Sequence, residues 1–253
     1  MIPKKIHYCW FGGNPKPKLT EKCIKSWKKY CPDYEIIEWN EENCPLDNMP
    51  LYVRQAYDAK KWAFVTDYVR LQIVYEQGGI YLDTDVEIIK PIDDLLENKA
   101  YFGFEDDRFV NTGHGFGAEA GLEILEEIMA DYADIPFILE DGSFDKTPCP
   151  RRNTEAFLRC GLEQNNSRQI ISDGVLILPA ECFAPKNWLT GELIITENTY
   201  SVHHYDASWY TPEQQKARKK RLREEELRRM PSTIGTKILG KENYEKIRSK
   251  LKG

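Results

Sequence analysis

The sequence predicts a single α/β domain over residues 1–210, followed by a helical extension over residues 211–253. The chain has 253 residues, a length that one α/β domain can occupy, and 41% of them are hydrophobic, enough for a core. Short strand-like runs alternate with helical patterns through the first 210 residues. From Pro212 onward the pattern changes to long, densely charged helical stretches.

The N-terminal quarter reads as alternating strands and helices. Residues 5–11 are predicted to form a strand with Ile6, Tyr8 and Trp10 on one face. Trp10, at the end of a strand, suits stacking on a nucleotide base, although burial in the core is the commoner role of such a residue. The next predicted elements are a helix at Leu19–Tyr30, a strand at Tyr34–Trp39 and a helix at Leu51–Lys60.

A helix predicted at Trp62–Gln77 carries two charged residues on one face. Asp67 and Arg70 are three positions apart and are therefore neighbours. One interpretation is an exposed ion pair of little energetic weight. The other is that this face looks into an active cleft, where Asp67 accepts hydrogen bonds from sugar hydroxyls and Arg70 donates to sugar or phosphate.

Two aspartates follow this helix between two short apolar strands, Ile80–Leu82 and Val86–Ile89. Gly78 and Gly79 give the backbone the freedom to end the helix and turn. Asp83 and Asp85 are two positions apart, so in an extended segment they point to the same face. Paired carboxylates suit a hard dication such as Mg²⁺ or Mn²⁺. The pair by itself also fits a polar turn, and the glycine-rich, apolar context favours the metal site.

The second half of the domain continues the alternation, with His203 and His204 adjacent in its last strand-like run. The predicted elements are strands at Ala100–Phe104 and Phe116–Ala118, a helix at Leu122–Tyr132, a connection over residues 134–152, a helix at Thr154–Leu162, a strand at Val175–Pro179 and a strand-like run at Thr199–Tyr205.

The C-terminal extension is basic, while the rest of the chain is acidic. Residues 211–253 hold 14 Lys/Arg and 6 Asp/Glu, against 21 and 35 in the remainder. Helices are predicted at Glu213–Met230 and Lys241–Lys252. A solvated surface helix and a peripheral contact with anionic lipid headgroups are both open interpretations. Nucleic acid is disfavoured, because no aromatic residues interleave with the charges and the body is acidic.

Composition predicts a cytoplasmic protein. If the basic extension contacts lipid headgroups, the protein would instead lie at the inner face of the membrane. There is no apolar run of about 18 residues that could span a bilayer, and the N-terminus lacks a signal-peptide core. The seven cysteines show no Cys-x-x-Cys pair and no zinc spacing, so we expect reduced thiols.

The series of Asp67, Arg70, Tyr81 and Asp83-x-Asp85 resembles the sugar-nucleotide site of glycosyltransferases with the A-type fold and a DxD motif. It is most similar to glycosyltransferase family 32, which includes capsular-polysaccharide sugar transferases, and also resembles the sugar-binding region of large clostridial glucosylating toxins. The resemblance rests on Ile2–Trp10, Ala63–Arg70, Gly78–Asp85 and His203–Trp209. It implies a single Rossmann-like nucleotide-sugar domain with a mixed central sheet over residues 1–210.

The same resemblance implies a catalytic set of four residues, Asp67, Arg70, Asp83 and Asp85. Asp83 would lie near the ribose and hold the metal directly or through water, and Asp85 would ligate the metal and so the diphosphate. Asp67 and Arg70 would hold the donor sugar. The expected cofactor is Mn²⁺ or Mg²⁺.

Further donor contacts follow from the resemblance at Trp10, Tyr81 and Asn111. Trp10 would stack on the base, which is expected to be uracil, Tyr81 would line the pocket, and Asn111 would lie near the donor sugar.

The run from His203 to Trp209 resembles a C-terminal loop that closes over the diphosphate. One of His203 and His204 would complete the metal shell, because strand alternation lets only one face the site. Ser208 and Trp209 would contact phosphate.

The function implied is a metal-dependent transfer of a hexose from a nucleotide sugar, with retention of the anomeric configuration. The donor is expected to be UDP-linked. The acceptor is expected to be a saccharide or lipid-linked saccharide in surface or capsular polysaccharide synthesis. No carboxylate can be named as a covalent nucleophile, so same-face attack by the acceptor hydroxyl is favoured. The alternatives are an effector that glycosylates a protein, a metal-dependent phosphate-ester hydrolase or nucleotidyltransferase, and a sugar-binding protein without catalysis.

Overall fold

The computed structural model describes residues 1–207, 210–230 and 243. The chain divides into two compact units. The first comprises Met1–Pro185 and Ile195–His204, and the second comprises Lys186–Ile194 and Tyr205–Gly253. Of the helix predicted at Lys241–Lys252, only residue 243 is among the described residues, so this prediction is not tested.

A mixed sheet of seven strands forms the centre of the first unit, in the order β2-β1-β3-β6-β5-β8-β7. Only β6 and β7 run antiparallel to their neighbours. The strands are β1 Lys5–Cys9, β2 Glu35–Trp39, β3 Gly79–Tyr81, β5 Ala100–Gly103, β6 Phe116–Ala118, β7 Gln169–Ile171 and β8 Val175–Leu178. The carboxyl ends of the parallel strands β1, β2 and β3 therefore meet at one edge of the sheet, where open α/β folds bind ligands.

A second, two-stranded sheet pairs β4, Val86–Ile88, with β9, Ser201–His203. The strands are antiparallel, and their register places Val86 opposite His203. This pairing brings a segment from the end of the domain next to the two aspartates that precede β4.

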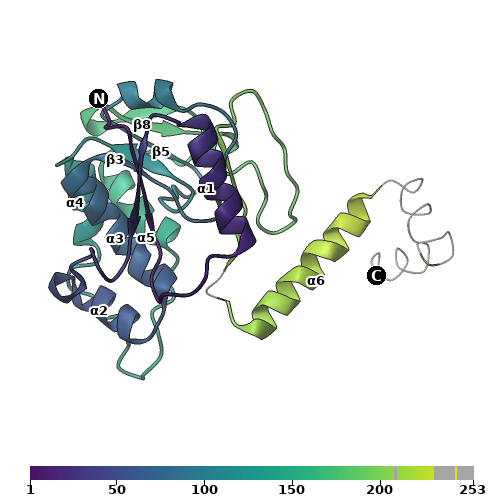
Figure 1. Cartoon of the computed structure of the whole chain (residues 1–253), viewed down its shortest axis with the longest axis horizontal. Coiled ribbons are helices and arrows are strands. Elements are labelled where there is room, and N and C mark those ends of the chain that lie inside the picture. The colour runs from purple at the N-terminus through teal and green to yellow at the C-terminus, as the bar shows by residue number, and fades with distance from the viewer. Residues whose placement is uncertain (208–209, 231–242, 244–253) are drawn as a thin grey trace. The chain divides into compact units, whose positions relative to one another are not determined.

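Helices cover both faces of the central sheet, and the alternation of β1 shows how the two faces are divided (Figure 1). Ile6 and Tyr8 join a buried cluster with Trp27 of α1. Cys9 and Phe11 join a larger cluster that holds side chains of the other four helices. The helices are α1 Lys18–Tyr30, α2 Leu51–Asp58, α3 Trp62–Gln77, α4 Glu123–Ala130 and α5 Cys149–Arg159, and the single-turn elements are η1 Leu46–Asn48, η2 Asp93–Glu97, η3 Ser172–Gly174 and η4 Ala180–Cys182.

The predicted fold class, an α/β domain with a mixed central sheet, is confirmed. All but one of the predicted helices and strands in the described residues begin and end within two residues of the observed ones. The exception is the helix predicted at Thr154–Leu162, which begins at Cys149, inside the predicted connection. Pro148 is its N-cap and Pro150 lies in its first turn, a position where proline is favoured rather than a loop signal.

Strand β7 was missed because it lacks the burial of a core strand. Ile170 at its centre is 63% exposed. Its antiparallel pairing with β8 at the edge of the sheet defines it.

In the second unit, α6, Pro212–Arg229, matches the predicted helix within one residue at each end. Thr211 begins it with a capping box, in which its hydroxyl accepts from the backbone of Gln214 and the Gln214 side chain accepts from the backbone of Thr211. The division of the chain near residue 210 into a catalytic domain and an extension stays a prediction.

Within the described part of the chain, none of the helices combines the length and the apolar character that crossing a membrane would require.

Candidate active site

Two charged residues of α3, Asp67 and Arg70, are buried at the candidate site. Asp67 and Arg70 are only 7% and 3% exposed, so the interpretation of an exposed ion pair is wrong. Arg70 Nη2 donates to Asp67 Oδ1 at 3.1 Å and lies 3.3 Å from Asp83 Oδ1. Its Nε donates to the carbonyl of Thr66 at 2.8 Å. One guanidinium thus joins the helix to the loop that follows β3.

Asp83 is held by groups on three elements. The Tyr81 hydroxyl donates to Asp83 Oδ1 at 3.0 Å, Arg70 Nη1 donates to its Oδ2 at 3.4 Å, and its carbonyl accepts from the backbone of Val86 at 3.0 Å. Burial raises the pKa of the Asp83 carboxyl, and Asp85 raises it further, while Arg70 opposes the shift. An added positive charge beside Asp83 would therefore favour its ionised form.

The two adjacent histidines point to different partners, as strand alternation requires. His203 Nε2 lies 3.2 Å from Asp85 Oδ1, and His203 is 8% exposed. His204 Nε2 lies 2.8 Å from Glu87 Oε2, which also pairs with Lys22. Burial lowers the pKa of His203, but the neighbouring carboxylates of Asp85 and Asp83 outweigh it and raise the pKa above its ordinary value. Of the two histidines, His203 is the one beside the aspartate pair.

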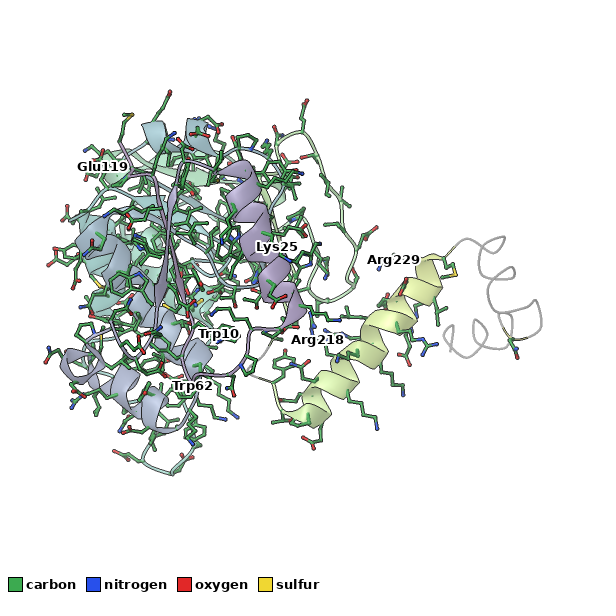
Figure 2. The ribbon with its side chains drawn as sticks, viewed as in Figure 1. Trp10, Lys25, Trp62, Glu119, Arg218 and Arg229 are labelled. Carbon is green, nitrogen blue, oxygen red and sulfur yellow. The ribbon has the colours of Figure 1, made fainter. Side chains whose placement is uncertain are left out.

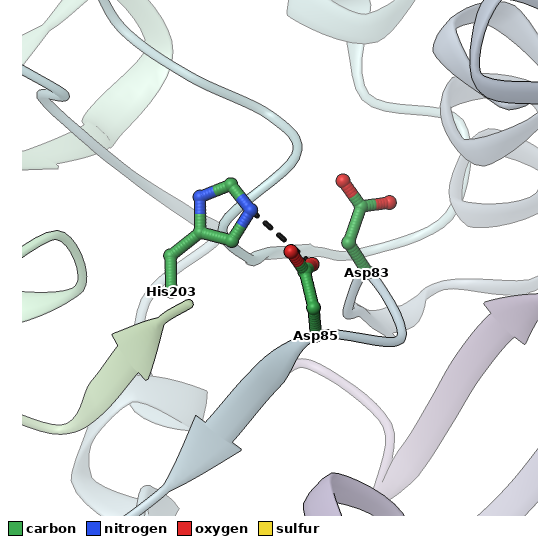
Figure 3. Close-up of side chains that lie close together, drawn as sticks. All are labelled: Asp83, Asp85 and His203. Atoms are coloured by element: carbon green, nitrogen blue, oxygen red, sulfur yellow. Dashed lines mark ion pairs between the residues drawn. The ribbon is translucent and has the colours of Figure 1, made fainter. Parts of the chain in front are cut away.

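The side chains of Asp83, Asp85 and His203 lie close together (Figure 3). One ligand atom of each lies within 4.8 Å of the others, and no other such group of three or more occurs among the residues that the structure describes. Two carboxylates and one imidazole suit a divalent ion, and the imidazole nitrogen fits Mn²⁺ better than the harder Mg²⁺. The donor set therefore fits the cation that the sequence predicts.

Residues 111–115, Asn-Thr-Gly-His-Gly, lie beside Asp83 and Arg70. Of these five residues, the sequence predicted a role for Asn111 alone. Asn111 is buried, and its Oδ1 accepts from the backbone of Gly113 at 2.6 Å. A Cβ on Gly113 would lie 2.7 Å from Asp83 Oδ2 and 2.8 Å from Arg70 Nη1. Gly113 was not predicted to matter, although two glycines within five residues beside a polar side chain were a signal of close backbone approach.

Trp10 lies at the carboxyl end of β1. It is partly buried, and its Nε1 donates to the carbonyl of Asn14 at 2.7 Å. A cavity of about 330 Å³ opens there. Its lining residues are Trp10, Gly13, Asn14, Lys16, Glu38, Asn40, Glu41 and Glu42. Because β1 and β3 are parallel neighbours, this cavity and the Asp83 loop follow strands that end at the same sheet edge.

Tyr81 and Asn111, two of the residues predicted to contact the donor, lie beside Asp83 and Arg70. Tyr81 is 1% exposed, so its ring has almost no surface that a donor could contact. Its hydroxyl donates to Asp83 and holds that carboxylate in place. Asn111 lies beside Gly113, within the same cluster as Arg70 and Asp83. Ser208 and Trp209 lie outside the described residues.

Residues 17–102 match the family model described as "Glycosyltransferase sugar-binding region containing DXD motif". The matched stretch contains α3, β3 and both aspartates of the Asp83-x-Asp85 pair. The resemblance predicted from the sequence is confirmed.

Curated relatives match over part of their length. Inositol phosphoceramide mannosyltransferase 3 of Schizosaccharomyces pombe is 36% identical over 104 residues, which are 40% of this chain and 29% of that protein. Subversion of eukaryotic traffic protein A of Legionella pneumophila is 29% identical over 129 residues, 41% of this chain and 20% of that protein. Initiation-specific alpha-1,6-mannosyltransferase of Candida albicans is 27% identical over 106 residues, 38% of this chain and 28% of that protein. The chain thus spans less than a third of each of these relatives.

Two solved structures show a distant likeness. PaToxG glycosyltransferase has a TM-score of 0.47 and 18% identity, covering 62% of this chain and 69% of that one. A glycosyltransferase involved in the glycosylation of the major capsid of PBCV-1 has a TM-score of 0.43 and 14% identity, covering 85% and 98%.

Proposed function

We propose that this chain is a metal-dependent glycosyltransferase that moves a hexose from a nucleotide sugar to a saccharide acceptor. The observation that carries the proposal is the convergence of Asp83, Asp85 and His203, backed by buried Arg70. The match of residues 17–102 to a DxD sugar-binding region supports it. A lipid-linked saccharide in surface or capsular polysaccharide synthesis is the acceptor we propose. Mannose is the first hexose to test, because two relatives are named mannosyltransferases.

Asp83, Asp85 and His203 would hold Mn²⁺ or Mg²⁺, which supplies positive charge to the oxygens of the leaving diphosphate. The protein's own contribution to that charge is Arg70. It is fixed by Asp67, Thr66 and Asp83, so little reorganisation is needed as the charge develops. Because Arg70 is 3% exposed, its charge is poorly screened by water and acts strongly at short range.

The acceptor step concerns the bond that forms at the anomeric carbon. Asp67, a further carboxylate beside the aspartate pair, accepts from Arg70 through its Oδ1 and is held in that ion pair. We therefore propose retention by same-face attack, in which the acceptor hydroxyl bonds to the anomeric carbon as the bond to the diphosphate breaks. The hydroxyl proton passes to the departing phosphate, so no protein nucleophile is required. A glycosyl adduct trapped on Asp67 would contradict this step.

The test is turnover of a panel of UDP- and GDP-linked sugars with Mn²⁺, with Mg²⁺ or with EDTA. We expect slow hydrolysis of one donor with metal and none with EDTA, because water replaces the acceptor. Release of free sugar and nucleoside diphosphate is measured by chromatography. Cleavage of simple phosphate esters, with no sugar nucleotide used, would favour a hydrolase instead.

The two histidines provide a matched pair for the metal site. His203→Ala is expected to weaken Mn²⁺ binding by about 10- to 100-fold, because it removes one of three ligands. His204→Ala should leave Mn²⁺ affinity unchanged, since its partner is Glu87. Mn²⁺ titration followed by electron paramagnetic resonance measures both. Equal affinities in the two variants would remove His203 from the site.

We expect activity and stability to respond to acid in opposite directions because of Asp67. Burial raises the pKa of its carboxyl to about 6, with Asp83 adding to the shift and Arg70 opposing it. As the pH falls through about 6, Asp67 takes a proton and its ion pair with Arg70 weakens, so donor turnover should fall.

The effect on stability has the opposite sign, because the folded chain binds this proton more tightly than the unfolded chain does. The contribution of Asp67 to the unfolding free energy should therefore rise as the pH falls from above 6 towards about 4. The pH profile of kcat/KM and urea unfolding of wild type and Asp67→Asn give both readouts. An acidic limb near pH 6 that persists in Asp67→Asn would assign that limb to another group.

A further inference from the structure

Polar side chains of the first unit lie both at its surface and in its interior. Lys25 of α1, for example, is exposed to solvent (Figure 2). Thr112 and Asn153 are instead 0% exposed. A buried hydroxyl or amide costs free energy unless it is hydrogen-bonded, so the partners of these two side chains show which parts of the fold they join.

Asn153, in the first half of α5, joins two segments that are distant from each other in sequence. Its Nδ2 donates to Thr112 Oγ1 at 3.0 Å, and its Oδ1 accepts from the Tyr132 hydroxyl at 2.9 Å. The next residue of α5 makes a second contact near Thr112, because Thr154 Oγ1 accepts from the backbone of Val110 at 3.0 Å. α5 therefore holds the segment that leads from β5 to β6 at two positions.

The segment held by α5 carries Gly113, which lies directly against the candidate active site. A Cβ on Gly113 would lie 2.7 Å from Asp83 Oδ2 and 2.8 Å from Arg70 Nη1, so the backbone packs closely against both groups. Because Thr112 and Gly113 are consecutive, the hydrogen bond to Asn153 limits how far Gly113 can move from Arg70.

We propose that Thr112 and Asn153 are positioning residues, which keep the backbone of Gly113 packed against Arg70 and so exclude water from the guanidinium. Arg70 is 3% exposed, and a charge in such surroundings acts more strongly than one in water. The benefit, which rests on the proposed function, is that Arg70 stabilises the negative charge that develops on the leaving diphosphate. Neither Thr112 nor Asn153 has to touch the donor to have this effect.

The two hydrogen bonds of the Asn153 amide allow positioning to be separated from stability. Thr112→Val removes the hydroxyl next to Gly113, and Tyr132→Phe removes the other hydroxyl. Each substitution keeps the size of the side chain and leaves one polar atom of Asn153 buried without its partner. Both should therefore lower the urea midpoint of unfolding by a similar amount. Thr112→Ser keeps the hydroxyl and is the conservative variant.

The first test uses the whole chain without donor or metal and follows solvent exchange of the Arg70 Nε–H by ¹⁵N NMR. In the wild type this group donates to the Thr66 carbonyl at 2.8 Å and should exchange slowly. We expect exchange to be about tenfold faster or more in Thr112→Val, because water reaches the guanidinium once Gly113 moves. Tyr132→Phe and Thr112→Ser should exchange as the wild type does. Arg70→Lys, which lacks this group, identifies the signal.

The second test is steady-state turnover of the nucleotide sugar that the wild type hydrolyses. Thr112→Val should lower kcat by about 10- to 100-fold with little change in KM for the donor, because Arg70 acts on charge that develops in the transition state. Thr112→Ser should recover most of this loss, and Tyr132→Phe should turn over donor at close to the wild-type rate.

Equal Arg70 exchange in Thr112→Val and Tyr132→Phe would overturn the proposal, because both hydrogen bonds would then serve stability alone. An equal loss of kcat in the two variants would overturn it too. If the wild type turns over no donor, the proposed function fails, and the Arg70 exchange rates still decide whether Thr112 positions Gly113 against Arg70.

Discussion

Replacing Asp85 by Asn is expected to lower turnover of the nucleotide sugar by about two to three orders of magnitude. Asn keeps the size of the side chain but removes the charge that faces His203 and the Asp83 carboxylate. The loss should appear in kcat at saturating donor, because the missing cation acts on charge that develops as the diphosphate leaves. Steady-state hydrolysis at a series of Mn²⁺ concentrations measures it.

The matched control is Glu87→Gln, two positions further along the same segment. Glu87 points to Lys22 and His204 rather than to His203. This variant should turn over donor at close to the wild-type rate and fold normally. If Asp85→Asn kept most of its activity while Glu87→Gln lost it, the site would have been assigned to the wrong carboxylate.

Replacing Arg70 by Met is expected to give the largest loss of stability of any single change in the site, about 3–5 kcal/mol. Met has a similar length and is apolar, but it leaves the buried Asp67 and the Asp83 carboxylate without the cation that both contact. Donor turnover should be lost as well. Urea unfolding of the whole chain, followed by far-UV circular dichroism, measures the first effect.

Arg159→Met is the control, because Arg159 also lies on a helix and also contacts two carboxylates, those of Glu127 and Asp131. Its side chain is 46% exposed, so water screens these pairs and the cost should stay below about 1 kcal/mol. Equal destabilisation by the two variants would show that burial of the Arg70 cluster does not strengthen its interactions.

The sequence predicts an element well where a residue marks its end. The helix at Trp62–Gln77 was predicted with both of its observed ends, because Gly78 follows it with a φ of 63° and stops it. The spacing of Asp67 and Arg70 predicts that they are neighbours, but it does not say whether they face solvent. The burial of Arg70 involves Asp83 and Gly113, which lie outside the helix.

For the metal ligands too, spacing predicts neighbours within one segment but not contacts between segments. Asp83 and Asp85 can be paired from their spacing, since both lie in one segment. The choice between His203 and His204 needs the register of β9 on β4, which pairs residues more than one hundred positions apart. Gly113 has no side chain. Its spacing from Gly115 signals a close approach of the backbone, but only the structure shows that the neighbours are Asp83 and Arg70.

Anomalous scattering would show whether Asp83, Asp85 and His203 bind Mn²⁺. Crystals grown with Mn²⁺ and UDP, measured at a wavelength where manganese scatters anomalously, would show the ion as an isolated peak. The account predicts one strong peak within bonding distance of Asp85 and His203, with Asp83 reached directly or through water, and no peak in Asp85→Asn crystals. A manganese peak elsewhere, or none at these side chains in crystals that contain the nucleotide, would contradict it.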